Sequence, residues 1–321
     1  METGTPKIEL LRYEHGIYAF DAGYIRPRLA AIHLIVENGR VAVVDTANNA
    51  ALPRALAALR ILGLSPASVA YVFLTHVHLD HAGGAGAMMR AFPEARLVVH
   101  PRGARHMADP AQLFAAVQAV YGEAEAHRLY GELLPVPADR ILVAGDGYSF
   151  DLGGRTLACL DTPGHARHHL CLLDTRGGSL FTGDIFGLSF RELDVGGRPS
   201  VIPTTTPTQF DPAAMHASVD RILEHRPAAL YLTHFAQVRD VPRLGGDLHR
   251  LIEAHVAVAE RERDRGPERG ARILAGLWAL MDAEAARQGW PLTADQRRAV
   301  LESDIQLNAQ GLEYWLEQTA S

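Results

Sequence analysis

Apolar positions along the first two-thirds of the chain follow two different spacings. Short runs rich in β-branched residues predict strands, and apolar residues that recur every three or four positions predict helices. The turn ENG, at residues 37–39, is typical of a hairpin between two of these strands. The predicted strands are 29–36, 40–46, 69–74 and 96–100, and the predicted helices are 51–62 and 83–92. This alternation indicates an α/β fold.

The pattern changes after residue 110. Residues 111–134 have helical spacing and interrupt the strands, so we predict a helical insert there. A helix is also predicted at 211–225, where Asp211 is a suitable cap. Strand patterns return at 147–165, 168–175, 178–184 and 228–235, the last strand that the pattern predicts.

Beyond about residue 240 the chain has only helical runs, broken by RGPERG, GWP and AQG. We therefore predict a core domain at 1–239 and a helical C-terminal region at 240–321. The last helical run has an apolar face, and such a face usually covers a domain or a dimer partner. We expect a cap on the core or a homodimer through these helices. The face consists of Ile305, Leu307, Leu312, Trp315 and Leu316.

Composition narrows the class of protein. The 321 residues are 48% hydrophobic and 21% charged, which is typical of a globular chain with a sizeable core. The net charge of −6 argues against a protein that holds nucleic-acid phosphates. The sequence shows no secretory leader and no apolar run long enough to span a membrane. Two cysteines require no disulfide framework, so we expect a cytoplasmic protein without membrane or nucleic-acid partners.

The stretch THVHLDHAGG, residues 75–84, concentrates metal-binding side chains directly after a predicted strand. Imidazole nitrogens and carboxylate oxygens are the ligands that zinc takes in catalytic sites. In an extended loop, residues two apart point the same way, so His76, His78 and Asp80 could converge. His81 would turn away as the next helix begins, and could reach a second metal.

Three further polar residues stand at the ends of predicted strands. They are His165 in DTPGH, Asp184 in LFTGD and His234 in YLTHF. In layered α/β folds, ligands collect at strand ends, on the loops that the strands feed. Together with the first motif, these residues predict a metal site.

On these motifs the chain resembles the metallo-β-lactamase fold superfamily, in particular its glyoxalase II-like hydrolases, over about residues 15–240. The resemblance implies an αββα sandwich, with two mixed sheets face to face, helices outside and metals at one edge. It also implies a ligand set for two metals. The first would be bound by His76, His78 and His165, the second by Asp80, His81 and His234, with Asp184 bridging both.

The resemblance further implies a function. With no ligand position vacant, two divalent metal ions are expected, zinc first, with iron or manganese as alternatives. A metal-bridging hydroxide would attack an ester-like bond, a thioester, lactone or ester, of a small-molecule substrate. Asp80 could also act as a catalytic residue that carries a proton to the leaving group.

Residues beside these motifs leave several interpretations open. Asp45 could orient a ligand imidazole or be an ordinary strand-end residue. His168 and His169 alternate on a predicted strand, so at most one should face the site, and neither is expected to be a ligand. Cys159 and Cys171 lie in two strands that could pair, and we expect them to be inert.

The pocket is predicted less sharply than the metal site. Aromatic residues of the helical insert, Phe114, Tyr121 and Tyr130, could form an apolar lid or simply pack between helices. Phe186 and Phe190 follow Asp184 closely and could line a pocket.

Three alternatives to the proposed hydrolysis remain, and one kind of lactone is disfavoured as a substrate. A phosphodiesterase would use the same metals. Acyl-homoserine lactonases carry a Tyr shortly after the bridging Asp, which IFGLSFRELDVGG lacks. An iron-dependent redox member, such as a persulfide dioxygenase, uses fewer ligands than this chain offers. A non-catalytic, metal-containing effector would act by binding a partner through the helical tail.

Overall fold

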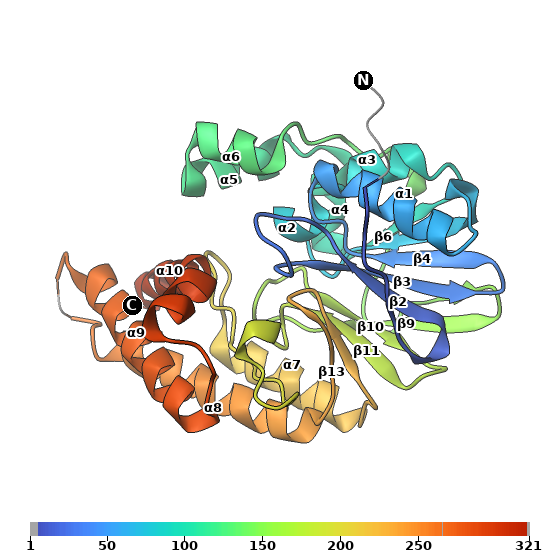
Figure 1. Ribbon diagram of the computed structural model, residues 1–321. Helices are drawn as coiled ribbons and strands as arrows, with labels where there is room; N and C mark the ends of the chain where they lie inside the picture. Colours follow the sequence, from blue (N-terminus) through green and yellow to red (C-terminus); the bar gives the residue numbers. More distant parts are fainter. Residues whose placement is uncertain (1–5, 265, 320–321) are drawn as a thin grey trace.

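Two β-sheets lie face to face with helices on their outer sides in the computed structural model of the protein, which describes residues 6–264 and 266–319 (Figure 1). In these residues one sheet has the strand order β1-β2-β3-β4-β5-β6-β7, and the other β13-β12-β11-β10-β9-β8. Helix α8 runs along α7 on the outer side of the second sheet, and α9 and α10 pack beside α8 (Figure 1). The predicted αββα sandwich with a helical C-terminal appendage is confirmed.

The strands are short and mostly buried. Those of the first sheet are β1 (Leu11–Arg12), β2 (Ile17–Asp21), β3 (Ala31–Glu37), β4 (Arg40–Val44), β5 (Val69–Phe73), β6 (Arg96–Val99) and β7 (Ile141–Val143). Those of the second are β8 (Ser149–Leu152), β9 (Arg155–Asp161), β10 (Leu170–Asp174), β11 (Ser179–Gly183), β12 (Leu230–Leu232) and β13 (Ala236–Val238).

The α-helices cover the sheets and form the C-terminal group. They are α1 (Leu52–Ile61), α2 (Leu79–Ala82), α3 (Ala85–Ala91), α4 (Pro101–Ala108), α5 (Ala111–Tyr121), α6 (Glu123–Tyr130), α7 (Pro212–Glu224), α8 (Val241–Glu260), α9 (Arg269–Gln288) and α10 (Ala294–Gln318). One-turn 3₁₀ helices occur at Glu14–Gly16, Asn49–Ala51, Pro66–Ser68, Ala138–Arg140 and Arg191–Leu193.

Strand direction decides where the polar strand-end residues meet. Strands β4, β5, β6 and β7 run parallel in the first sheet, and β11 runs parallel to β12 in the second. Parallel strands end at the same edge of a sheet. Asp45 after β4 and the histidine motif after β5 therefore share one edge, and Asp184 after β11 and His234 after β12 share the corresponding edge of the second sheet.

The core between the sheets is built by alternating inward side chains. Ile35, Val44 and Phe73 of the first sheet belong to one buried cluster with Leu172 and Phe181 of the second. Burying a side chain of this size contributes about 1.5–3 kcal/mol. This packing fixes the two sheets against each other and so fixes the edge that carries the polar residues.

The two cysteines occupy paired strands, as expected. In the antiparallel pair β9–β10, Cys159 lies opposite Leu172 and Cys171 opposite Leu160. Both thiols are free and buried, and burial raises the pKa of each to about 12. A thiol held in its neutral form is a poor nucleophile and metal ligand.

Three sequence expectations need correction. The insert is not one continuous helix, because Gly122 has a positive φ of 82° that ends α5 and begins α6. The residues after Tyr130 are not helical. The run 228–235 is not the last strand: the chain reverses after β12, and β13 pairs with it antiparallel.

The C-terminal helices pack on one another and on the second sheet's outer helix. Helices α8 and α7 are in contact, and α10 contacts both α8 and α9. Within the expected apolar face of α10, Ile305, Leu312 and Leu316 are buried. In the described part of the chain, no helix is long and apolar enough to cross a membrane.

His255, in the middle of α8, makes the folded state sensitive to acid. Its ring is buried and its Nδ1 donates to the Leu251 carbonyl at 2.7 Å. Burial lowers the pKa of His255 to about 4. The unfolded chain, with an ordinary pKa near 6.5, therefore binds a proton that the folded chain does not, and stability is lost as pH falls from about 6.5 to about 4.

Replacing His255 with Leu should weaken this acid sensitivity. At 1.36 kcal/mol per pKa unit, the variant should lose about 2 kcal/mol less stability than the parent between pH 7.5 and pH 5. Urea unfolding of metal-free protein at the two pH values measures the difference. Exposed His225 is the control, and His225→Leu should behave like the parent. An equal loss in His255→Leu and the parent would contradict the assignment.

Candidate metal centre

The histidine motif forms the connection between β5 and α2. His78 is the N-terminal cap residue of α2, so His76 and His78 lie on the loop while Asp80 and His81 lie on the helix. Gly84, which follows, is packed against the loop after β4. A Cβ there would lie 2.7 Å from the carbonyl oxygens of Thr46 and Asn48. Any larger residue would move the motif away from that loop.

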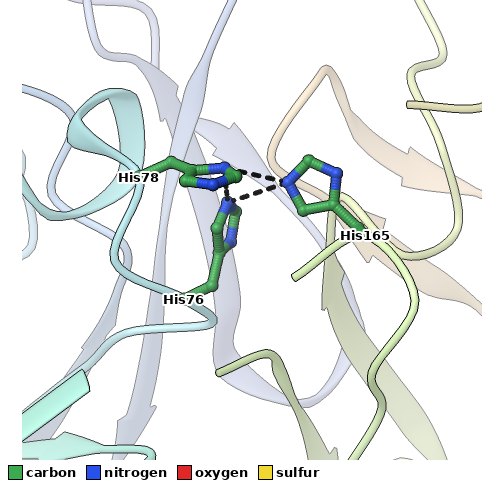
Figure 2. Close-up of side chains that lie close together, drawn as sticks. All are labelled: His76, His78 and His165. Carbon is green, nitrogen blue, oxygen red and sulfur yellow. Dashed lines mark hydrogen bonds between the residues drawn. The ribbon is translucent and has the colours of Figure 1, made fainter. Parts of the chain in front are cut away.

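Three imidazoles converge on one point at the sheet edge. The His78 Nδ1 lies 3.0 Å from both His76 Nε2 and His165 Nε2, and the last two atoms are 3.3 Å apart (Figure 2). Zinc–nitrogen bonds of about 2.0–2.1 Å in a tetrahedral arrangement separate ligand nitrogens by about 3.3 Å. The three atoms therefore have the spacing of ligands around one metal ion.

A second cluster lies beside the first. Its imidazoles are His81 and His234, and its carboxylates are Asp80 and Asp184. The Asp80 Oδ2 lies 3.5 Å from His81 Nε2 and 3.4 Å from His234 Nε2. The Asp184 Oδ1 lies 3.2 Å and 3.5 Å from the same two nitrogens. These four side chains also converge, with alternating imidazole and carboxylate donors.

Asp184 stands between the two clusters. While its Oδ1 faces His81, its Oδ2 lies 3.6 Å from His165 Nε2 of the first cluster. One carboxylate thus presents an oxygen to each group, as a bridging ligand does. The structure brings together all seven side chains that the sequence singled out.

The first cluster consists of neutral imidazoles. Burial and the neighbouring His81 hold the pKa of His76 well below its ordinary value. Burial also lowers the pKa of His165, and that of His78 to about 3. Neutral imidazoles carry the free lone pair that a metal ion requires.

In the second cluster, the neighbouring carboxylates favour a charged imidazole. Burial alone would lower the pKa of His81, but Asp184, Asp80 and Asp45 outweigh it and raise that pKa well above its usual value. Burial alone would likewise raise the pKa of Asp80, yet His81 and His234 hold it well below its usual value. The carboxylates therefore favour positive charge in this place, which protons or a metal cation can supply.

The buried atoms of the second cluster fit a cation. The His81 Nε2 and Asp184 Oδ1 are buried 3.2 Å apart, and neither makes a well-formed hydrogen bond to a described residue. Buried polar atoms normally have hydrogen-bond partners. With three neutral imidazoles beside them, the donor set suits divalent metal ions in both clusters.

Comparison with protein families agrees with this geometry. The model of the metallo-β-lactamase superfamily matches residues 25–234. The chain belongs to the metallo-β-lactamase superfamily. This fold implies divalent-metal binding, and the two His/Asp clusters could hold the ions.

Curated relatives include proteins named as thioesterases. The metallo-β-lactamase fold-containing protein ST1585 of Sulfurisphaera tokodaii is 26% identical over 224 residues, 68% of this chain and 78% of that protein. The atrochrysone carboxyl ACP thioesterase of Aspergillus fumigatus is 31% identical over 116 residues, 36% of this chain. The chain spans only 27% of that thioesterase's length.

Solved structures share the fold over nearly the whole chain. A metallo-β-lactamase family protein of Thermus thermophilus has a TM-score of 0.66 at 22% identity, covering 95% of this chain and 94% of its own. The crystal structure of ST1585 gives 0.62 at 22% identity, covering 93% and 98%. Both matches extend over the C-terminal helices of this metallo-β-lactamase superfamily member.

Hydrogen bonds behind the imidazoles set which nitrogen faces the centre. In this metallo-β-lactamase superfamily member, His81 Nδ1 lies 2.8 Å from Asp45 Oδ2, and His234 Nδ1 lies 2.7 Å from the Leu29 carbonyl oxygen. An oxygen that only accepts keeps the proton on Nδ1 and leaves Nε2 as the donor to a metal. The Thr75 hydroxyl, which donates to Asp45, similarly accepts from His76 Nδ1 at 3.1 Å.

Asp45 is the centre of this supporting network. It is buried and accepts from the Thr75 backbone N–H at 2.9 Å and the Thr233 hydroxyl at 2.7 Å, in addition to His81. The sequence left open whether Asp45 orients a ligand imidazole or is an ordinary strand-end residue. The geometry favours the orienting role. The carboxylate ties the loops after β4, β5 and β12 to a single point.

Asp45→Asn should weaken the second cluster selectively. The asparagine side chain has the shape of aspartate, but its NH₂ group cannot accept a hydrogen bond. This group would face side chains that donate to Asp45, so the His81 imidazole would lose its fixed orientation. Removing such a supporting group typically costs 10–100-fold in metal affinity. Competition with a chromophoric chelator should show one weakened ion and one unchanged. Asp151→Asn, at an exposed position of β8, is the control. Unchanged affinity for both ions would contradict the role given to Asp45.

His168 and His169 do not lie on a strand, which corrects the sequence prediction. Strand β10 begins at Leu170, and both residues lie in the preceding loop, so the side-to-side alternation of a strand does not apply to them. The His169 Nε2 accepts from the Asp184 backbone N–H at 3.3 Å, and its Nδ1 lies 2.9 Å from the Thr162 hydroxyl. The His168 ring lies 5.7 Å from that of His78. Both rings therefore neighbour the clusters.

The aromatic residues have mixed roles. Phe114 packs on His127 within the insert, with ring centroids 4.8 Å apart. The Tyr130 hydroxyl is 2.8 Å from the Tyr24 hydroxyl, and both rings are buried. The Tyr121 side chain lies outside the described residues. Phe186 and Phe190 are buried, and Phe190 lies 6.5 Å from the His234 ring.

Proposed function

We propose that the protein is a dinuclear, metal-dependent hydrolase that cleaves an ester-like bond of a small molecule, with zinc as the first choice of metal. The observation that carries the proposal is the pair of ligand clusters joined by Asp184. Binding two ions would use every side chain of both clusters. A pair of divalent cations, when bound, polarises a carbonyl oxygen and lowers the pKa of water to the neutral range.

The exposure of the carboxylates supports different roles for them. The Asp80 side chain is 25% exposed, that of Asp184 8%, and that of His81 is fully buried. Asp184 is therefore enclosed, where it can hold the two clusters together. Asp80 meets solvent, so a leaving group can approach it, and we assign it the transfer of a proton to that group.

The names of the relatives favour a thioester among the ester-like bonds. Besides the Aspergillus fumigatus protein, thioesterase pkgB of Emericella nidulans is 28% identical over 150 residues, 47% of this chain and 34% of that protein. A thioester carbonyl needs the same polarisation as a lactone or an ester. We therefore rank the thioester first and keep the other two in the same proposal.

A metal-reconstitution assay tests the proposal. Protein treated with chelator is reloaded with zinc, manganese or iron and offered an acyl thioester, a lactone, an aryl ester and a phosphodiester, while oxygen uptake is recorded. We expect metal-dependent cleavage of a carbonyl ester or thioester, lost again in His165→Ala. Cleavage of the phosphodiester alone, oxygen uptake, or bound metal with no turnover would each overturn the proposal.

A further inference from the structure

The C-terminal helix α10 is hydrogen-bonded to the segment 203–206, which lies next to the metal centre. The contact is made by Asn308, which is 1% exposed. Its Oδ1 accepts from the Thr205 backbone N–H at 2.7 Å, and its Nδ2 donates to the Pro203 carbonyl at 2.9 Å. The Thr205 hydroxyl also donates to the Asn308 carbonyl at 3.0 Å. All three of these hydrogen bonds join Asn308 to the segment 203–206.

Gly311, one turn further along α10, shows how close the approach is. A Cβ at this position would lie 1.6 Å from the Thr205 carbonyl oxygen. Real atoms do not approach so closely, so the helix and the segment could not keep this contact with any other residue at 311. The helix is thus held against residues 203–206 by hydrogen bonds at Asn308 and by shape at Gly311.

Thr204, between the two residues that Asn308 holds, contacts the metal centre directly. Its hydroxyl donates to the Asp184 carbonyl at 3.0 Å, and lies 2.9 Å from His165 Nδ1. A hydroxyl has one proton, and a carbonyl can only accept. The Thr204 oxygen must therefore accept from His165 Nδ1–H, which leaves Nε2 as the free donor facing His76 and His78.

We propose that Asn308 is a positioning residue of the metal centre, which acts through Thr204 to hold His165 in the orientation and tautomer that bind metal. This inference rests on the proposed function, because it assumes that the clusters bind divalent ions. This role of Asn308 means that α10 helps to hold the ligands of the first ion in place, although the helix carries none of the seven ligands. The effect should fall on the site that contains His165, since His165 takes its tautomer from Thr204.

Asn308→Ala should lower the affinity for one ion by about 10–100-fold, the range seen when a supporting partner of a ligand is removed. The probe is zinc alone, titrated against a chromophoric chelator, with cobalt absorption as a second readout of the coordination sphere. Leu316→Ala, at a buried apolar position of the same helix, is the control for simple loss of packing. It should lower thermal stability and leave both affinities within about twofold of the parent.

Two further variants show whether Asn308 acts through Thr204. Thr204→Val removes the hydroxyl, so in the double variant the loss of affinity should be smaller than the product of the two single losses. In a His76→Ala background, where the first site is already disabled, Asn308→Ala should leave the affinity of the remaining ion unchanged. These two measurements follow metal binding and need no substrate.

The outcomes separate this inference from the proposed function. If the parent binds two ions but Asn308→Ala changes neither affinity, or weakens both to the same degree, the positioning role is wrong and the metal centre stands. Independent effects of Asn308→Ala and Thr204→Val would also overturn it. If the parent binds no divalent ion, the proposed function itself fails.

Discussion

His76→Ala protein should retain one divalent ion per chain and lose catalysis, whereas His81→Ala should retain the other ion. The His76 Nε2 belongs to the three-imidazole cluster, 3.0 Å and 3.3 Å from its two partners. The His81 Nε2 instead faces Asp80 and Asp184. Because the proposed hydrolysis would need the positive charge of both ions, we expect each variant to lose about 10³-fold or more in kcat/KM.

Metal content per chain after dialysis measures this division. The parent should hold about two ions and each variant about one, with different affinities for the ion that remains. His225→Ala, which changes an exposed histidine away from the clusters, should match the parent. If either ligand variant lost both ions to the same degree, the separation into two sites would be wrong.

Asp174→Asn should cost about 3–5 kcal/mol of stability and leave the metal centre intact. Asp174 and Arg155 form a fully buried bidentate pair, with Nε–Oδ1 at 2.8 Å and Nη2–Oδ2 at 2.7 Å. Asparagine has the same size but no charge, so the buried Arg155 guanidinium would lose its bidentate partner and keep only Glu37, whose Oε2 lies 3.7 Å from Nη1. Removing one partner of such a pair is far more costly than the pair itself is stabilising.

Urea unfolding measures this cost, and an exposed ion pair provides the comparison. Glu125→Gln breaks the exposed pair of Glu125 with Arg128 and should leave the unfolding midpoint unchanged. Arg155 begins β9 and Asp174 ends β10, so the buried pair lies at the opposite end of these strands from His165. Metal content and kcat should therefore be normal in folded Asp174→Asn protein. A loss below about 1 kcal/mol would contradict the prediction.

The sandwich could be predicted because most of its strands can be recognised from a few consecutive residues. The strand that ends at Phe73 is a continuous apolar run followed at once by the histidine motif, and both signals lie within a few residues. Strand β13 has only three residues and takes its conformation from pairing with β12 across a turn, so the sequence carries no local sign of it. The break at Gly122 depends on a single positive φ within a helical pattern.

The metal ligands could be predicted from the sequence, whereas the residues that support them could not. Side chains such as His165 and Asp184 could be identified because each follows an apolar strand and has a chemistry that few other roles require. Thr204 and Asn308 were missed, since hydroxyls and amides occur throughout the chain and no spacing relates these two. Only the fold brings them together. The run PTTTPT, residues 203–208, is the one visible sign of an unusual segment.

The contact between Asn308 and Thr205 also sets an order of events during synthesis, because the two residues are 103 positions apart. At a translation rate of about 5–20 residues per second, His234, the last of the seven ligands along the chain, leaves the ribosome about 4–15 s before Asn308 does. A nascent chain in that interval has all seven ligands, but lacks the support that we propose Asn308 gives to His165. We expect such chains to exchange zinc freely with cellular buffers, and to retain it firmly only after Asn308 has emerged and α10 has packed on residues 203–206.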